Sequence, residues 1–518
     1  MESTELKKTT RTIRFNMDWM KIEDIVDVAD GLAWPILSVA PEFRSAIARG
    51  AEFVDRLLRE DGTIYGVTTG LGDSCMVMVG SELAAELPRN LYTYHGCGLG
   101  EYLTPPQTRA VIATRLTSLC KGFSGVSIEL LEQMMRLLHA GLLPRIPSEG
   151  SVGASGDLTP LSYLAAVLCG EGEVWREGAA APAAGGLGEA RIAPLGLRPQ
   201  EALAIMIGTP VMTALACLAY SRAEYLSRLV TRVTALASVA LDGNAYHFDE
   251  TLFSVKPHRG QQRIAAWLRA DLIWDEPLRN ARRLQDRYSI RCAPHVIGVL
   301  ADALPWLRES IENELNSAND NPIIDAADER VLYGGHFYGG HIAFAMDCMK
   351  NAVANLADLL DRQMALLVDS RFNNGLPANL SGIEGPRLAI NHGLKALQNS
   401  ASPWTAEALK LTMPASVFSR STECHNQDKV SMGTIAARDC LRILELSEQV
   451  VAALLISVRQ GVWLRRRLNP SLVLQEPLQR MLHQLENDIA AVDEDRRLEP
   501  DLRLLLERIH HRAWNLYE

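Results

Sequence analysis

Hydrophobic residues recur at three- and four-residue spacing in three stretches that contain neither glycine nor proline, namely Val211–Asp242, His341–Asn374 and Thr434–Gln460. One such stripe consists of Met349, Val353, Leu356, Leu360 and Met364, and a second consists of Leu441, Leu444, Leu446, Val450 and Leu454. This spacing predicts helices that each bury one apolar face. A helix of about 30 residues is about 45 Å long, which favours a bundle and an oligomer interface. Left-handed caps are expected near the helix ends at Gly243, Gly375 and Gly461.

The first 200 residues are richer in glycine and in short segments. Strand patterns are sparse, so we expect a mainly α fold in which a glycine-rich N-terminal part precedes a long-helix bundle. The predicted domains are residues 1–210 and residues 211–518, the latter including a C-terminal helical region. Within the first domain, Glu171–Gln200 is expected to be the loosest part, with an exposed loop at Ala179–Gly188.

Composition favours a protein that handles small molecules. The chain of 518 residues has 52 Lys and Arg against 62 Asp and Glu, a net charge of −10, with no block of basic residues, which argues against nucleic-acid binding. No signal peptide or membrane span is expected, because no apolar run reaches about 18 residues. Nine cysteines without a CxxC pair favour reduced, mostly buried thiols and a cytoplasmic location, with no metal site.

The segment GSVGASGDLTPLSYLA, which begins at Gly150, leads directly into a helical pattern. One interpretation is a flexible turn, with Asp157 capping the helix and Pro160 in its first turn. The other is chemical. In a tight Ala154–Ser155–Gly156 bend, the Gly156 nitrogen can attack the Ala154 carbonyl, and loss of water, including the Ser155 hydroxyl, leaves an electrophilic ring with an exocyclic methylidene. Gly156 is required because a side chain there would block the bend.

This segment resembles the signature of the histidine, phenylalanine and tyrosine ammonia-lyase family, whose members carry a methylidene-imidazolone (MIO) group made in this way. The match covers Gly150–Leu161, and similar segments follow in the same order from Tyr65 to Leu498–Leu506. The resemblance therefore implies an MIO cofactor formed autocatalytically from Ala154, Ser155 and Gly156, with no metal or nucleotide. It also implies a homotetramer whose active sites are shared between subunits.

Tyr65 opens the segment YGVTTGLG, which by composition alone is a glycine-rich turn. The resemblance makes Tyr65 the base that takes the substrate's β-proton. A phenol needs a cationic or electrophilic neighbour to act as a base near neutral pH. Gly66, Gly70 and Gly72 fit a loop that closes over substrate. Thr68 stands where many relatives have Asn.

Four further segments carry family-like residues. In LQDRYSIRC, the resemblance places Gln285 and Tyr288 around the prosthetic group and substrate, and Arg291 on the substrate carboxylate, which suits the guanidinium fork. Without the resemblance, Tyr288 and Arg291 are an ordinary helix-face pair. The Asn316–Pro322 segment is expected to end a helix and to brace the MIO loop. The aromatic wall of the site and the substrate end of the pocket are assigned by resemblance to Phe337, Asn426 and Gln427.

One position departs from the family pattern. EALAIMIGTP has Ile207 where the family has an Asn that contacts the prosthetic group and the substrate amine. Isoleucine can neither donate nor accept a hydrogen bond, and loss of one preorganised donor costs about 10²–10³ in rate. Either a neighbour substitutes for the amide, or the chain is slower, altered in reaction outcome, or engineered.

Substrate choice is predicted from Tyr94, His95 and Gln427. Histidine-specific relatives have Ser-His at the first two positions, tyrosine-specific ones His-Leu, and phenylalanine-specific ones an aromatic residue followed by Leu; Tyr94-His95 matches none of these. His95 favours a polar ring, although it could be a packed histidine. Gln427 replaces the Glu of histidine lyases and favours a neutral ring. We therefore expect a Tyr- or Phe-like L-amino acid, with His less favoured.

The predicted function is elimination of ammonia from an aromatic L-amino acid to give an arylacrylate. A 2,3-aminomutase, which re-adds the amine at the β-carbon, has all the same motifs and stays an alternative. A catalytically attenuated member, or a non-catalytic helical scaffold that has kept the fold, is a third interpretation, favoured only by Ile207.

Overall fold

A computed structural model describes residues 11–60, 62–176, 178–272 and 284–517. The chain forms two compact units. Unit 1 comprises residues 1–221, 308–347 and 414–438, and unit 2 comprises residues 222–307, 348–413 and 439–518. Unit 1 thus takes in two segments that lie far along the sequence. Compactness alone does not define domains, so the boundary between residues 210 and 211 stays a prediction.

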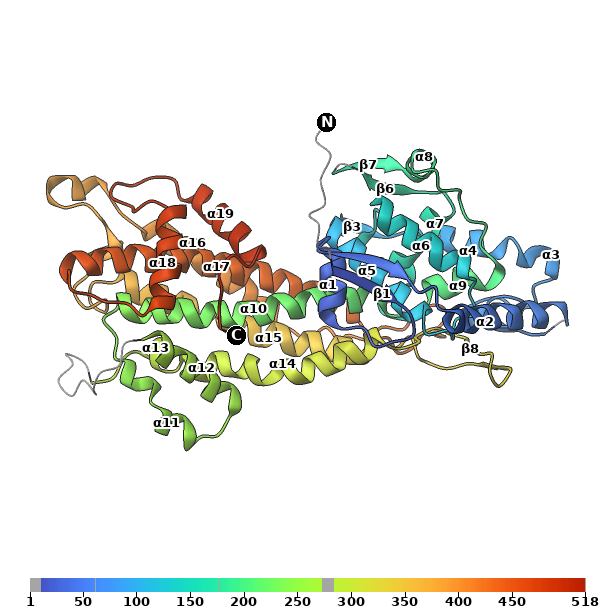
Figure 1. Cartoon of the computed structure of the whole chain (residues 1–518), viewed down its shortest axis with the longest axis horizontal. Coiled ribbons are helices and arrows are strands. Elements are labelled where there is room, and N and C mark those ends of the chain that lie inside the picture. The colour runs from blue at the N-terminus through green and yellow to red at the C-terminus, as the bar shows by residue number, and fades with distance from the viewer. Residues whose placement is uncertain (1–10, 61, 177, 273–283, 518) are drawn as a thin grey trace. The chain divides into compact units, whose positions relative to one another are not determined.

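Unit 1 contains the strands and the shorter N-terminal helices (Figure 1), which are β1 Arg11–Phe15, α1 Ile22–Ala29, β2 Ala33–Leu37, α2 Pro41–Arg59, η1 Gly72–Met76, α3 Ser81–Ala84, α4 Leu87–His95, β3 Leu99–Tyr102, α5 Pro105–Leu119, α6 Ile128–Ala140, β4 Leu143–Pro144, β5 Pro147–Glu149, α7 Leu158–Leu168, β6 Glu173–Arg176, β7 Ala179–Pro182, α8 Ala183–Glu189, α9 Pro199–Met206, β8 Ile323–Asp325 and β9 Arg330–Leu332. The strands form small separate sheets: β1 pairs with β2 in parallel, while the β3–β5, β4–β6–β7 and β8–β9 pairings are antiparallel.

Unit 2 is helical in its described residues, with η2 Ala245–Phe248, α11 Glu250–Ser254, α12 Arg259–Asp271, α13 Tyr288–Arg291, η3 Ala378–Leu380, η4 Gly385–Ile390, α16 Lys395–Lys410, α18 Glu476–Asp488 and α19 Glu499–His510. Four longer helices contribute residues to both units, namely α10 Pro210–Ala240, α14 Ala293–Leu315, α15 Gly340–Val368 and α17 Gly433–Leu468. The predicted mainly α fold with a glycine-rich N-terminal part and a long-helix body is confirmed.

The three predicted long helices are α10, α15 and α17, and their predicted stripes are buried. In α15 the stripe from Met349 to Met364 is fully buried, as are the α17 stripe residues from Leu444 to Leu454. Within unit 2 these helices lie side by side: Gln363 of α15 donates to Thr234 of α10 (3.0 Å). Among the described residues, no helix is both long and apolar enough to cross a membrane.

Two of the three predicted glycine caps are wrong. At the end of α10 the left-handed residue is Asp242, not Gly243. Gly461 lies inside α17, where a Cβ would come within 3.0 Å of Ala240, so this glycine permits close helix packing instead of ending the helix. Only Gly375 takes a left-handed conformation (φ 94°), a few residues after α15 ends.

The predicted loop at Ala179–Gly188 is also wrong. Residues 179–182 form β7, which pairs with β6, and α8 follows directly. Leu187 is fully buried, and a Cβ added at Gly186 would lie 2.9 Å from Leu142 and 3.4 Å from Val174, so the alanine-rich stretch packs against a small core. The expectation of mostly buried thiols is likewise wrong: all nine cysteines are free, but only Cys120, Cys217 and Cys440 are buried.

Candidate active site

The Ala154–Ser155–Gly156 tripeptide lies in the bend before α7, where it pairs with Gly208. Gly208 N–H donates to the Ser155 carbonyl (3.1 Å), and Asp157 N–H donates to the Gly208 carbonyl (2.7 Å). Gly156 has a left-handed φ of 77°, and a Cβ there would lie 1.8 Å from the Gly208 oxygen. Only glycine fits at this position, as the sequence predicts.

Asp157 is fully buried behind the bend and holds two segments together. One carboxylate oxygen accepts from the backbone N–H groups of Val211 (3.0 Å) and Met212 (2.9 Å). The other accepts from the hydroxyls of Ser151 (3.0 Å) and Thr434. The prediction that Asp157 caps the helix that follows it is therefore wrong: it caps α10, whose N-terminus starts close to the bend. Burial raises the pKa of the carboxyl, against the effect of these hydrogen bonds.

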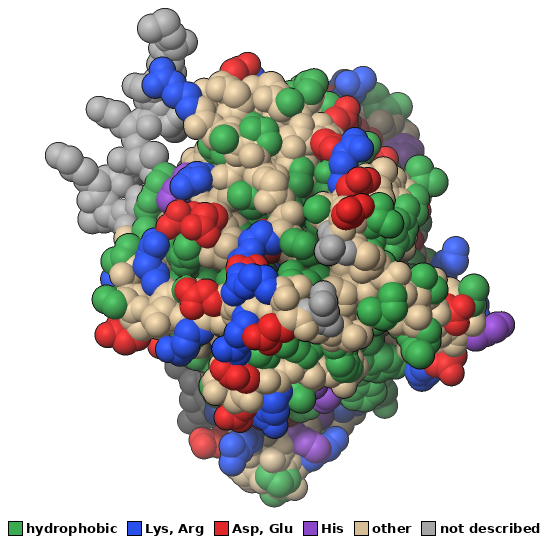
Figure 2. All heavy atoms as spheres, turned by 90° about the vertical axis from the view of Figure 1, so that its right-hand side faces the viewer, with side chains coloured by type: hydrophobic (Ala, Val, Ile, Leu, Met, Phe, Trp, Pro, Cys, Tyr) green, Lys and Arg blue, Asp and Glu red, His purple; other side chains and the backbone are tan. Residues whose placement is uncertain are grey.

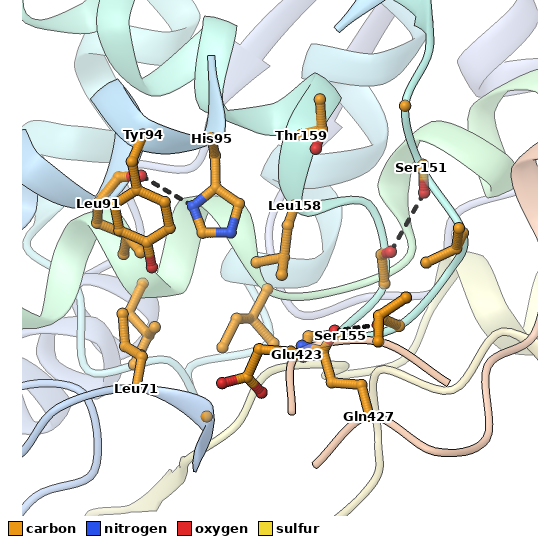
Figure 3. A pocket seen from close by; sticks show the side chains of 18 of the residues that line it. Leu71, Leu91, Tyr94, His95, Ser151, Ser155, Leu158, Thr159, Glu423 and Gln427 are labelled. Carbon is orange, nitrogen blue, oxygen red and sulfur yellow. Dashed lines mark hydrogen bonds between the residues drawn. The ribbon is translucent and has the colours of Figure 1, made fainter. Parts of the chain in front are cut away.

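Two cavities meet at this bend, and both are lined by residues of unit 1. The first, of about 510 Å³, lies between the bend and α4 (Figure 3). The second, of about 600 Å³, has Asn321, Tyr333 and Phe337 in its lining. Both cavities are lined in part by Tyr65, Gly72, Ala154, Ser155 and Gln427. Each cavity therefore borders both the tripeptide and Tyr65.

Tyr65 precedes a small closed loop. Gly70 N–H donates to the Val77 carbonyl and Val79 N–H donates to the Thr68 carbonyl (2.8 Å each), which closes the loop around η1. Gly72 N–H donates to the Tyr65 oxygen (2.7 Å), so the phenol accepts one hydrogen bond and keeps its own proton to donate. Burial raises the pKa of Tyr65 despite this bond, and the charge of Glu423 raises it further. Among the described residues, no cation lowers the pKa of Tyr65.

Glu423 is a site residue that the sequence did not reveal. Its carboxylate accepts from Asp73 N–H (2.7 Å) and from the Asn426 amide (2.8 Å), so it joins the Tyr65 loop to the turn at residues 422–427. This turn is strained, because Glu423, Cys424 and His425 are consecutive non-glycine residues with φ between 53° and 66°. A side chain on Gly72 would collide with the Glu423 carboxylate. A lone Glu within the segment ECHNQ offers no pattern that marks it.

Tyr94 and His95 project from the end of α4 into the first cavity, on the side opposite Ser155 and Gln427 (Figure 3). Their rings are 4.2 Å apart. His95 Nδ1 lies 2.9 Å from the Leu91 carbonyl, and because a carbonyl can only accept, Nδ1 carries the proton. Burial lowers the pKa of His95, so the ring is neutral at pH 7 and Nε2 is a hydrogen-bond acceptor.

The structure brings most of the remaining predicted residues to the two cavities. Ile207 is 3% exposed and lines the first cavity, and Phe337 and Asn426 line the second. Gln427 lines both: its amide donates weakly to Ser155 Oγ (3.4 Å), and its oxygen accepts from the Thr422 hydroxyl (3.0 Å). The Gln427 side chain is thus held by its own turn and touches the tripeptide.

Gln285, Tyr288 and Arg291 are the predicted site residues that line neither cavity. They belong to unit 2, where α13 brings the Arg291 guanidinium over the Tyr288 ring at 4.6 Å from its centre. Arg291 also donates to the Asp286 carbonyl (3.0 Å). Of the described residues that line either cavity, Lys429 is the only Lys or Arg, and it lies on the second cavity.

The residues present fit a ring made from Ala154, Ser155 and Gly156. They are the residue types that the chemistry needs, and the close approach of Gly208 to Gly156 enforces the bend. Within the described ranges, no cluster of three or more His, Cys, Asp or Glu side chains could hold a metal ion. The face in Figure 2 carries acidic and basic side chains interleaved, without the broad basic surface typical of nucleic-acid binding.

Comparisons with known proteins agree with this site. The sequence model of a family described as aromatic amino acid lyase matches residues 20–487. A histidine ammonia-lyase of Bacillus velezensis is 36% identical over 463 residues, which are 89% of this chain and 88% of that one. Among solved structures, a tyrosine aminomutase from Streptomyces globisporus has a TM-score of 0.88 at 30% identity, covering 96% of this chain and 97% of its own. A histidine ammonia-lyase from Trypanosoma cruzi has a TM-score of 0.88 at 29% identity, covering 97% and 94%.

Proposed function

Because the chain belongs to the aromatic amino acid lyase family and is a carbon–nitrogen lyase of the ammonia-lyase type, we propose that it eliminates ammonia from an aromatic L-amino acid with a prosthetic group of its own making. The observation that carries this proposal is the Gly156–Gly208 pairing, which holds the Ala154–Ser155–Gly156 bend at the meeting point of two cavities. When formed from Ala154, Ser155 and Gly156, the MIO ring would supply an electrophilic carbon toward the substrate's amine.

Tyr65 is proposed to take the β-proton, since it lies on both cavities beside the tripeptide. Its raised pKa shows that the described residues of unit 1 do not by themselves make it a base at neutral pH. A cation that approaches the phenol in the assembled enzyme would lower its pKa. The Gly72 N–H that donates to the phenol oxygen also stabilises the phenolate.

The substrate ring is proposed to lie between α4 and the bend, within reach of His95. Because His95 Nε2 accepts a hydrogen bond, this end of the cavity favours a ring that carries a donor. The phenol of L-tyrosine meets that requirement and the phenyl ring of L-phenylalanine does not. The predicted preference for a Tyr- or Phe-like substrate is not supported by the relatives named histidine ammonia-lyase. The imidazole N–H of L-histidine is also a donor, so L-histidine meets the same requirement. L-tyrosine is proposed ahead of L-histidine because Gln427 has a neutral amide, which supplies no carboxylate to pair with a protonated histidine ring.

The substrate carboxylate is proposed to bind Arg291 of a partner subunit. The first cavity has no Lys or Arg among its described lining residues, and its acidic Glu423 would repel a carboxylate. Gln285, Tyr288 and Arg291 lie in unit 2 and line neither cavity. This gap supports a homotetramer in which one copy completes the site of another. Mixing inactive Tyr65→Phe and Arg291→Ala variants should restore part of the activity, and a mixture that stays inactive would contradict shared sites.

A 2,3-aminomutase is the second candidate, favoured by the similarity to the tyrosine aminomutase structure over 96% of the chain. Ile207 places an apolar side chain in the first cavity where the family pattern has an amide. Ammonia released from the substrate therefore has one fewer hydrogen-bond partner in this cavity. Lyase and aminomutase share the tripeptide and Tyr65, and they differ in whether the arylacrylate leaves before the amine returns.

A product assay with L-tyrosine, L-phenylalanine and L-histidine tests the proposal. We expect an arylacrylate and free ammonia, formed fastest from L-tyrosine. A β-amino acid as the main product would replace the lyase with the aminomutase. Failure of the enzyme to consume any of the three substrates would contradict the proposed function.

A further inference from the structure

The pairing of Gly208 with the bend leaves one particular amide unbonded. The two hydrogen bonds, to the Ser155 carbonyl and from the Asp157 N–H, lie on either side of Gly156. Among the described residues, none accepts a hydrogen bond from the Gly156 N–H itself. The nitrogen that must attack the Ala154 carbonyl is therefore left available, while its neighbours on both sides are held in place.

Gly208 is in turn held from behind by a buried guanidinium. Arg115 and Asp320 are almost fully buried (0% and 1% exposed) and pair at 2.8 Å. Arg115 Nη2 also donates to the carbonyls of Ile207 (2.7 Å) and Ala204, and Nη1 donates to Asn319 Oδ1 (3.0 Å). Arg115 thus bonds the backbone residue that precedes Gly208.

Asn319 and Arg115 also fill the space next to Gly208 on the side away from Gly156. Its φ is 135°, and a Cβ there would lie 2.2 Å from Asn319 Oδ1 and 2.6 Å from Arg115 Nη1. Asn319 Oδ1 further accepts from the Thr209 N–H (3.4 Å). Gly208 therefore lies between Gly156 on one side and the Arg115–Asn319 contact on the other, and cannot retreat from the bend without breaking these bonds.

We infer that Arg115 is a positioning residue for ring formation: by holding Ile207 and Gly208 against residues 155–157, it presses the bend into the conformation from which the Gly156 nitrogen reaches the Ala154 carbon. The inference rests on the proposed function, because it concerns how that function's prosthetic group is made. Arg115 lines neither cavity, so its role is to hold the backbone and not to bind substrate.

The chemistry balances without a co-reactant. The Gly156 N–H adds across the Ala154 carbonyl, which forms the new C–N bond and places the amide proton on oxygen. That hydroxyl leaves as water with the Ser155 N–H proton, which gives a ring C=N bond. Ser155 then loses its Cα proton and its hydroxyl as a second water, which gives the exocyclic methylidene. No electron acceptor is consumed, so the conformation of the bend is the main requirement that the protein must meet.

The test replaces the charge pair with apolar residues, since removing only one partner of a buried pair leaves an unpaired charge and destabilises the fold. The Arg115→Met/Asp320→Leu double variant removes both charges and the donors to Ile207 and Ala204. The matched control is Arg232→Met/Asp271→Leu, a buried pair in unit 2 at 2.7 Å. Full-length chains are synthesised in vitro, and samples are withdrawn over time for intact-mass measurement.

We expect the wild-type and control chains to lose two waters at the same rate. The Arg115 double variant should lose them about ten- to a hundredfold more slowly, as loss of hydrogen bonds to a charged donor implies. Equal rates in a folded double variant overturn the inference. If the double variant does not fold, Arg115→Lys decides: it keeps the charge but loses the guanidinium fork, so ring formation at the wild-type rate overturns the inference and slower formation supports it.

The same mass measurement separates this inference from the proposed function. A wild-type chain that never loses the two waters overturns the proposed function, and this inference with it. A wild-type chain that loses them at the same rate as the Arg115 variant overturns only the role of Arg115.

Discussion

The two walls of the first cavity are built in opposite ways. The wall formed by residues 151–157, here the bend wall, is held by the fully buried Asp157 and by the pairing with Gly208. The wall formed by residues 65–79, here the loop wall, ends in exposed side chains, with Met76 87% and Met78 63% exposed. Within this wall Gly72 N–H donates to the Tyr65 oxygen, and Asp73 N–H joins the wall to another segment of the site by donating to Glu423.

This difference matches two different tasks. Bond formation within the backbone needs a conformation that cannot relax, and buried charge and close glycine contacts supply it. Proton transfer and substrate entry need a group that can approach and withdraw, and a loop held by a few exposed hydrogen bonds can do so. Variants in the bend wall should therefore affect whether the group forms, and variants in the loop wall should affect how well substrate is used.

The largest effect is expected from Ser155→Ala, which removes the hydroxyl that leaves as the second water. Activity should fall by at least about a thousandfold, since the electrophile is lost entirely. The fold should be unchanged, because within the described ranges Ser155 Oγ accepts one weak hydrogen bond, from the Gln427 amide. Activity assays and intact mass check this, and an active variant would exclude Ser155 as the source of the methylidene.

Tyr65→Phe tests the loop wall at the residue proposed as the base. Removing a general base should lower kcat by about 10²–10⁴. The mass loss of two waters should persist, because Tyr65 lies on the loop wall and is not part of the bend. A variant that fails to form the group would show that the two walls do not act separately.

Glu423→Gln tests the link between the loop wall and the turn at residues 422–427. A neutral amide accepts a weaker hydrogen bond from Asp73 N–H than a carboxylate does, so kcat/KM should fall by about five- to tenfold. Limited proteolysis should cut residues 72–80 faster. Glu82→Gln, an exposed carboxylate on α3, is the matched control. Equal proteolysis rates in both variants would rule out Glu423 as the link.

The smallest effect is expected from pH acting on His95. Burial lowers the pKa of His95 below its usual value of about 6.5, so Nε2 accepts a hydrogen bond at neutral pH. Nε2 becomes a donor only when the pH falls below this lowered pKa. The ratio of kcat/KM for L-tyrosine to that for L-phenylalanine should therefore drop several-fold on the acid side of pH 6.5. A His95→Gln variant should show a flat ratio. A wild-type ratio that does not change with pH would separate His95 from substrate choice.

Local patterns in the sequence predicted the long helices and the tripeptide, because helix periodicity and the Ala-Ser-Gly chemistry depend on neighbouring residues. Contacts between distant segments were predicted only where the family resemblance supplied them. Arg115 and Asp320 lie 205 positions apart, and no pattern in α5, which also contains Arg109, marks Arg115 as the arginine of a buried pair. Asp157 capping α10 and Glu423 reaching Asp73 likewise depend on how distant segments meet. The resemblance assigned Gln285, Tyr288 and Arg291 to the site, but in this chain they line neither cavity, and we propose that a partner copy supplies them.

The intact mass of the purified wild-type protein, followed by mapping of the peptide that contains residues 150–160, tests the central claim most directly. The account predicts a chain lighter by two waters than its sequence, with the whole difference in Ala154–Ser155–Gly156. An unmodified mass in a folded protein, or a mass difference located in another peptide, would contradict it.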